Sequence, residues 1–379
     1  MGLIYLDNAS TSFPKPESVV QAIGRALKEV GANPGRGGYS RARAADRLVY
    51  ETRNLATRFF NAPDPARVVF TPGGTYSINM ALNGFLNDGD HLIVTGRQHN
   101  AVMRPLGAMQ GRVSVSRLRW DGTGPIDEGF AALVTPRTRA VVVNHASNVD
   151  GLLYPLRELG LLAKRFGLLL IVDAAQTAGL VEIDMVRDGI DILCVTAHKG
   201  LWGIAGTGML ALGAGVALEP LVCGGTGSFS DSYQMPEAYP DRLEAGSANL
   251  TGIAAVKAGM EEVMRIGVRE IMGAKMLLAR TAYEGLQSFA GVRLFWPGVD
   301  MARIPLFSFT LDRLDPSDVG TTLDERYNIA CRAGLHCAMD AHREIGSYPM
   351  GTVRFAPGYF TTKDEVELFV RAVGELSGK

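Results

Sequence analysis

The chain has 379 residues, of which 47% are hydrophobic and 20% are charged, and its formal net charge is −1 at pH 7. This composition is typical of a soluble globular protein with room for two domains. A charge so close to zero argues against a general nucleic-acid binder and against a membrane-surface protein. The four cysteines show neither CxxC metal-site spacing nor the density of a disulfide framework, and the first residues lack a signal-peptide pattern. We therefore expect a cytoplasmic protein with no metal site and no membrane span.

The N-terminal half alternates between predicted strands and predicted helices. Residues 3–6 are predicted to form a short strand, which leads into the polar turn at residues 7–11. After this turn, apolar runs typical of strands alternate with segments of helical apolar spacing. We predict helices at 19–30, 44–60 and 156–166 and strands that begin near residues 67, 91 and 139. This alternation indicates a parallel sheet with right-handed crossover helices.

Two further apolar runs end in polar, reactive side chains. Runs of this kind are typical of buried strands in a parallel sheet. In open α/β sheets, ligands bind beyond the carboxyl ends of the strands. We therefore expect these side chains to share one crevice. They are Asp173, Gln176, Thr196, His198 and Lys199.

A carboxylate and a lysine in one such crevice suit pyridoxal phosphate. Its aldehyde needs a lysine for a Schiff base, and its pyridine nitrogen needs an acid that keeps it protonated. For a single Asp and Lys, a buried ion pair at the end of a sheet is the alternative. The full pattern is more specific, because each strand also supplies an amide, a hydroxyl or an imidazole.

The C-terminal third differs in character. We expect the stretch MLALGAG after Lys199 to run antiparallel on the sheet, and one long helix to span residues 256–289. The following strands GVRLFW and IPLFSFTL alternate apolar and polar residues, as in a half-exposed antiparallel sheet. We interpret this region as a smaller domain.

Several segments together resemble the class V aminotransferase family, most of all its cysteine desulfurase and selenocysteine lyase branch (group II-like). They are LDNAST, DAAQTAG, THKGLWGIAGTGML, RLEAGSANLTG, the RxGxHC pattern and GYFTT. The resemblance implies an α/β protein of fold-type I, a pyridoxal-phosphate-dependent transferase fold with a large domain around a mostly parallel sheet of the seven-stranded type. The large domain would span residues 14–252 and the smaller α+β domain residues 253–379, joined by the N-terminal segment 1–13.

The resemblance also assigns expected cofactor contacts. Lys199 would form the Schiff base, Asp173 would contact the ring nitrogen, and His99 would stack on the ring as a catalytic residue. The phosphate would be bound by Gly74, Thr75, Thr196 and His198, and by Ser247 of the neighbouring subunit. Asn148 and Gln176 would contact the phenolic oxygen. From the residues alone, Gly-Gly-Thr is a glycine-rich turn before a helix and suits a phosphate, whereas Asn148 could equally form an Asx turn.

Cys337 is the predicted sulfur acceptor. It lies in a polar stretch beside histidine and arginine, and positive neighbours favour a nucleophilic thiolate. Cys194, inside an apolar strand, fits a buried hydrophobic role instead.

Arginine is the preferred partner of a carboxylate. The resemblance places the amino acid's α-carboxylate at Arg354, with Arg36, Arg332 and Asn148 as further substrate contacts.

Two positions depart from the family pattern. Gln98 stands where a glutamate usually precedes the stacking histidine, and we expect this change to remove a charge near the ring. Leu335 stands where a histidine usually lies, which leaves the substrate preference open.

The sequence therefore predicts a homodimeric cysteine desulfurase with shared active sites. It would convert L-cysteine to L-alanine and leave a persulfide on Cys337, which a sulfur-acceptor protein could relieve. A selenocysteine lyase, a cystine or sulfinate lyase, or another class V enzyme remains an alternative. A non-catalytic protein with the same fold is a second alternative, against which the intact lysine, aspartate and cysteine argue. A nicotinamide enzyme fits worse, since no GxGxxG follows the first strand.

Overall fold

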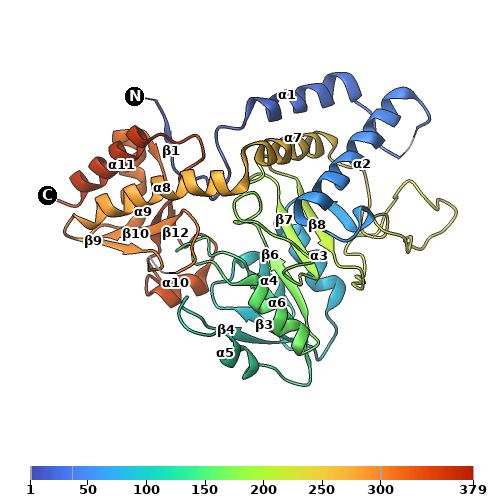
Figure 1. Ribbon diagram of the computed structural model, residues 1–379, viewed down its shortest axis with the longest axis horizontal. Coiled ribbons are helices and arrows are strands. Elements are labelled where there is room, and N and C mark those ends of the chain that lie inside the picture. The colour runs from blue at the N-terminus through green and yellow to red at the C-terminus, as the bar shows by residue number, and fades with distance from the viewer. Residues whose placement is uncertain (1, 36, 299–300, 379) are drawn as a thin grey trace.

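A computed structural model describes residues 2–35, 37–298 and 301–378 (Figure 1). Its main sheet has seven strands, and their order in space differs from their order in the chain. Across the sheet the strands are β2 (Val68–Thr71), β8 (Gly208–Leu212), β7 (Ile192–Thr196), β6 (Leu169–Asp173), β5 (Thr138–Asn144), β3 (His91–Thr95) and β4 (Ser114–Leu118). Strand β8 runs opposite to the other six strands of this sheet, as expected for MLALGAG. The expected mostly parallel seven-stranded sheet is confirmed.

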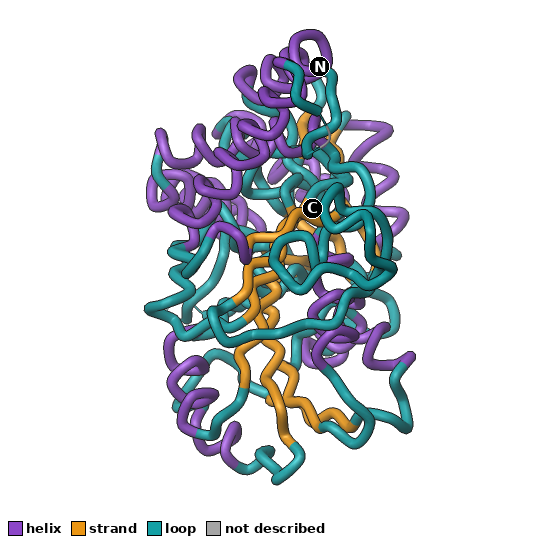
Figure 2. Tube along the Cα trace, turned by 90° about the vertical axis from the view of Figure 1, so that its right-hand side faces the viewer, coloured by secondary structure: helices purple, strands orange, loops and turns teal. Residues whose placement is uncertain are grey.

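Helices cover both faces of this sheet (Figure 2). Successive strand residues point to opposite faces, so a strand buried on both sides is apolar throughout. Val141 and Val143 pack with α2 (Ser40–Phe60), α5 (Asp127–Ala131), α6 (Leu156–Arg165) and α7 (Leu250–Ile266). Ala140 and Val142 pack on the other face with α3 (Gly74–Phe85) and α4 (Asn100–Ala108).

A second sheet lies at the other end of the molecule and is antiparallel, as expected (Figure 1). Its strands in spatial order are β12 (Arg332–Gly334), β13 (Thr352–Phe355), β10 (Phe307–Leu311) and β9 (Val292–Phe295). Three helices supply its apolar core, namely α8 (Val268–Gln287), α9 (Pro316–Tyr327) and α11 (Lys363–Leu376). A short helix, α10 (Met339–Ile345), follows β12.

The prediction of one long helix at residues 256–289 is wrong, because two helices occupy this region. Helix α7 ends at Ile266, Gly267 follows with a φ of 100°, and α8 begins at the next residue. Few residues other than glycine adopt this conformation, so it breaks the helix. Helix α7 packs on the large sheet and α8 on the small one. The domain boundaries at 14–252 and 253–379 remain a prediction.

The N-terminal segment connects the two sheets. Strand β1 (Ile4–Tyr5) pairs in parallel with β11 (Ile329–Ala330), beside the small sheet. The chain then turns toward the end of β7, where the backbone N–H of Ser12 donates to the carbonyl of His198 at 3.0 Å. Helix α1 (Glu17–Arg25) follows and continues into a wider helical turn, Ala26–Val30. Residues 7–15 therefore lie where the two sheets meet.

Candidate active site

A cavity of about 490 Å³ opens beyond the carboxyl ends of the central strands. This volume is within the range of small-molecule sites. Ten of the residues expected at the site line this cavity. They are Gly74, Thr75, His99, Asn148, Asp173, Gln176, Thr196, His198, Lys199 and Arg332.

Asp173 and Lys199 reach the cavity from the ends of the adjacent strands β6 and β7. The Asp173 carboxylate accepts a hydrogen bond from the backbone N–H of Ala175 at 2.9 Å. Burial raises the pKa of Asp173, although this hydrogen bond and the nearby Lys199 oppose the shift. Burial also lowers the pKa of Lys199 to about 8, against the opposing effect of Asp173. A larger fraction of the amine is therefore neutral and nucleophilic than in an ordinary lysine.

The turn between β2 and α3 forms one wall of the cavity. Gly73 has a φ of 151°, and α3 begins at Gly74, so the backbone N–H groups of the first helical turn are available to an anion. A Cβ on Gly74 would lie 3.3 Å from the Cβ of Thr196. The glycine thus keeps this turn close to the end of β7. His198 Nδ1 is buried and has no hydrogen-bond partner among the described residues.

His99 caps the N-terminus of α4, because its Nδ1 accepts a hydrogen bond from the backbone N–H of Ala101 at 3.0 Å. This contact leaves the proton of the neutral ring on Nε2. Burial, with Lys199 and Arg332 as the next contributors, lowers the pKa of His99 to about 4. The imidazole is therefore neutral at physiological pH.

Gln98 does not line the cavity. It is only 1% exposed, and its amide donates to Thr95 Oγ1 and to the Val142 carbonyl, both at 2.8 Å. Its side chain is bonded within the sheet, and its expected effect on the charge near the ring stays a prediction.

Asn148 links the cavity to the cysteine loop. Its Nδ2 donates to the carbonyl of His336 at 2.7 Å, whereas its buried Oδ1 has no partner among the described residues. Gln176 donates to the carbonyl of Ala9 at 3.1 Å and so anchors the N-terminal segment. Both amides hold neighbouring chain segments in addition to lining the cavity.

Arg354 lies on β13 and is fully buried behind the cavity rather than on its wall. One guanidinium nitrogen donates to Asp7 Oδ1 at 2.6 Å and to Ser10 Oγ at 3.0 Å, and the other donates to the Asn148 carbonyl at 2.9 Å. Its Nε is buried and has no hydrogen-bond partner in the described part of the chain. Arg332 is the expected substrate-binding arginine that lines the cavity itself.

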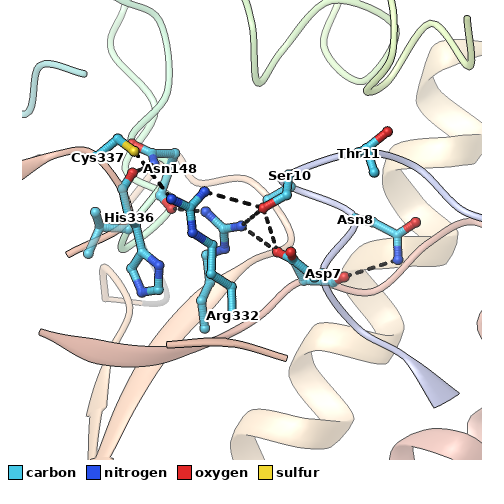
Figure 3. A network of polar contacts seen from close by, with 12 residues as sticks. Asp7, Asn8, Ser10, Thr11, Asn148, Arg332, His336 and Cys337 are labelled. Carbon is cyan, nitrogen blue, oxygen red and sulfur yellow. Dashed lines mark hydrogen bonds and ion pairs between the residues drawn. The ribbon is translucent and has the colours of Figure 1, made fainter. Parts of the chain in front are cut away.

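Cys337 is exposed and lies outside the cavity lining, but Arg332 Nη2 donates to its Sγ at 3.2 Å (Figure 3). The positive neighbour of the thiol is therefore Arg332. His342, which is close in sequence, is buried and its Nδ1 is bonded to Ser347 Oγ at 2.7 Å. Cys194 is fully buried, and burial raises the pKa of its thiol, in line with a hydrophobic role.

Besides Arg354 and Cys337, two further expected site residues are not among those that line this cavity. Ser247 lines an adjacent cavity of about 510 Å³, which shares Pro72, Tyr76 and Gly206 with the first one. Arg36 lies outside the described residues.

The contacts of Asp7, Ser10 and Lys15 in this region were not predicted from the sequence. Ser10 lines the cavity. Lys15 Nζ donates to the His198 carbonyl at 2.9 Å, and the hydroxyls of Thr11 and Ser12 point to the same oxygen at 3.1 and 3.3 Å. Asp7 and Ser10 belong to the LDNAST segment, whose resemblance to the family could have indicated a role for them.

Comparison with known proteins agrees with this geometry. The model of the aminotransferase class-V family matches residues 4–369, and the chain therefore belongs to this family. A "Probable cysteine desulfurase" from Methanothermobacter thermautotrophicus is 33% identical over 99% of this chain and 95% of its own length. The apo structure of a cysteine desulfurase from Thermococcus onnurineus NA1 has a TM-score of 0.91 and 29% identity over 99% of this chain and 94% of that one.

A cysteine desulfurase from Escherichia coli, solved in an S-sulfonic acid form, has a TM-score of 0.87 and 29% identity. The match covers 98% of this chain and 94% of the Escherichia coli chain. The fold is therefore that of the fold-type I pyridoxal-phosphate enzymes. No helix in the described part of the chain is long and apolar enough to cross a bilayer.

Proposed function

We propose that this chain is a pyridoxal-phosphate-dependent cysteine desulfurase that converts L-cysteine to L-alanine and leaves a persulfide on Cys337. One observation carries the proposal. Lys199 and Asp173 share a cavity, and Arg332 on the wall of that cavity also contacts the Cys337 sulfur. A site for amino-acid chemistry therefore lies one side chain away from an exposed thiol. The activity named for the similar proteins supports the same assignment.

The residues of the cavity fit pyridoxal phosphate. The cavity offers a desolvated lysine amine, a buried carboxylate and a neutral imidazole ring. The buried atoms His198 Nδ1 and Asn148 Oδ1 have no hydrogen-bond partner within residues 2–35, 37–298 and 301–378. When bound, the cofactor forms a Schiff base with an amine and withdraws electrons from the α-carbon of an amino acid.

Each lining residue then has a proposed role. Lys199 would hold the cofactor covalently, Asp173 would pair with its ring nitrogen, and His99 would lie against its ring. The remaining contacts would be Gly74, Thr75, Thr196 and His198 at the phosphate, and Asn148 and Gln176 at the phenolic oxygen.

Lys199 can also move the proton of the reaction. Its neutral amine would accept the proton that leaves the substrate's α-carbon. The same amine can later return a proton to the product. A pKa of about 8 suits both transfers near neutral pH.

The sulfur step is balanced without an external oxidant. The Cys337 thiolate attacks the sulfur of L-cysteine and forms an S–S bond, and the carbon–sulfur bond breaks. The electron pair of that bond remains with the β-carbon, which gains a proton and becomes the methyl group of alanine. The sulfur is oxidised to the persulfide level and the carbon is reduced.

Product analysis tests this proposal. Purified protein with pyridoxal phosphate would be given L-cysteine, L-selenocysteine or cysteine sulfinate, and the alanine from each would be quantified. We expect alanine from L-cysteine at a rate matched by the appearance of persulfide or sulfide. Alanine from selenocysteine alone would reassign the chain to a lyase. No alanine from any of the three would refute both functions.

We also propose a homodimer in which Ser247 of each subunit reaches the phosphate of the other site. Within its own chain Ser247 lines a cavity that adjoins the active-site cavity, and the contact across subunits rests on the family resemblance. The exposure of Cys337 suits transfer of its sulfur to an acceptor protein, and the four free cysteines suit a reducing cytoplasm.

A further inference from the structure

The hydroxyl of Ser10 lies where two guanidinium groups and one carboxylate meet (Figure 3). It accepts hydrogen bonds from Arg354 Nη2 at 3.0 Å and from Arg332 Nη1 at 3.4 Å, and it donates to Asp7 Oδ1 at 2.8 Å. A hydroxyl has one donor and two acceptor positions. All three are therefore in use.

The two arginines are not equivalent toward a ligand. Asp7 neutralises Arg354, whose side chain is fully buried. Arg332 lines the cavity, and its guanidinium donates to the Ser10 hydroxyl and to the Cys337 sulfur. The Ser10 hydroxyl is thus the group that ties the cavity-facing cation to the buried Asp7–Arg354 pair.

We infer that Ser10 is a positioning residue for the substrate's carboxylate. Its hydroxyl fixes the guanidinium groups of both Arg354 and Arg332 beside the cavity, so that an amino acid's α-carboxylate meets fixed cations. Because arginine binds carboxylates through a planar fork, a small change in its orientation weakens the pair. This inference rests on the proposed function, since it takes the ligand to be an amino acid.

The hydroxyl is not needed merely to fix the N-terminal segment. Gln176 binds the Ala9 carbonyl, and three side chains of residues 11–15 bind the His198 carbonyl. Removal of the Ser10 hydroxyl leaves these anchors intact, so its effect should be on ligand binding rather than on folding.

The test compares Ser10→Ala and Ser10→Val, which lack the hydroxyl, with Ser10→Thr, which keeps it. We expect Ala and Val to raise KM for L-cysteine about tenfold, which corresponds to about 1.4 kcal/mol, with kcat changed less than about twofold. The Kd of the product L-alanine, measured by calorimetry, should rise by the same factor. Thr should behave like the wild type.

Ser18→Ala is the matched control, because Ser18 Oγ is buried and has no partner among the described residues. Equal KM values for the Thr and Val variants would overturn the inference, as would a fall in kcat at unchanged KM. A wild-type protein that releases no alanine from L-cysteine would instead refute the proposed function. The two failures are therefore distinguishable.

Discussion

At the scale of single residues, the cysteine loop adopts an unusual backbone conformation. His336 and Cys337 have φ values of 48° and 58°, which is the left-handed region. A residue other than glycine that adopts this conformation costs about 1–2 kcal/mol of stability. Two hydrogen bonds of 2.7 Å oppose this cost, from Asn148 Nδ2 to the His336 carbonyl and from the Asn100 N–H to the Cys337 carbonyl. The conformation places the Cys337 sulfur beside Arg332.

Replacement of Cys337 by alanine should abolish sulfur transfer and leave cofactor binding unchanged. The cavity lining does not include Cys337, so the cofactor contacts do not depend on the thiol. Persulfide formation and the cofactor's absorbance would be measured on the same sample. Cys223→Ala, which removes another exposed thiol, should change neither signal. Loss of the absorbance in Cys337→Ala would contradict the separation of the two roles.

The pKa of Lys199 gives a pH prediction. Its folded-state value of about 8 lies below the ordinary 10.5 of lysine. Only the neutral amine attacks an aldehyde, so the rate at which the apoprotein binds pyridoxal phosphate covalently should rise as the pH passes through about 8 and then level off. Stopped-flow absorbance measures this rate.

Lys199→Arg, whose guanidinium stays charged, should give no covalent band at any pH. A wild-type rate that does not change across this pH range would show that burial does not set the reactivity of the amine.

At the scale of secondary-structure elements, the catalytic edge of the sheet could be predicted from local patterns. Asp173 and Lys199 follow apolar runs, and adjacent parallel strands bring their ends together. The Asp7–Arg354 contact could not be predicted in this way, because its partners are 347 positions apart. It depends on the pairing of β1 with β11 beside the small sheet, which local periodicity does not encode. The break at Gly267 was missed because apolar helical spacing continues on both sides of it.

The close approach of β8 to the glycine turn can be tested with Gly208→Ala. A Cβ there would lie 2.6 Å from the Val195 carbonyl oxygen and 2.8 Å from the backbone of Gly73. We expect a loss of about 1–3 kcal/mol in the free energy of unfolding and weaker cofactor binding, because the Gly73 turn must shift. Urea unfolding measures the first effect, and cofactor titration measures the second.

Gly107→Ala in α4 is the control, since a Cβ at this position meets nothing within 4 Å. It should leave stability unchanged or slightly raised. If Gly208→Ala is as stable as this control, the approach of β8 to the turn is not restrictive.

At the scale of the whole molecule, the site combines two sheets and the segment between them. The large sheet supplies Asp173 and Lys199, the small sheet supplies Arg332 and Arg354, and the N-terminal segment supplies Ser10. The residues proposed for carboxylate recognition and those proposed for cofactor chemistry therefore come from different parts of the chain. Their relative position depends on the polar contacts of residues 7–15.

The proposed homodimer makes a prediction about Ser247. Light scattering should give about twice the chain mass of 40.6 kDa. Ser247→Ala should raise the Kd for pyridoxal phosphate about tenfold, because a hydrogen bond to a charged group contributes about 1.5–3 kcal/mol, without dissociating the dimer. A monomer that retains the cofactor as firmly as any dimeric form would contradict the shared site.

The most direct test of the account is a single turnover followed by mass spectrometry. Protein loaded with pyridoxal phosphate would receive less than one equivalent of L-cysteine, and the alanine and the mass of the Cys337 peptide would be measured together. The account predicts one added sulfur atom on Cys337 for each alanine formed. Alanine without added sulfur on Cys337, or no alanine at all, would contradict it.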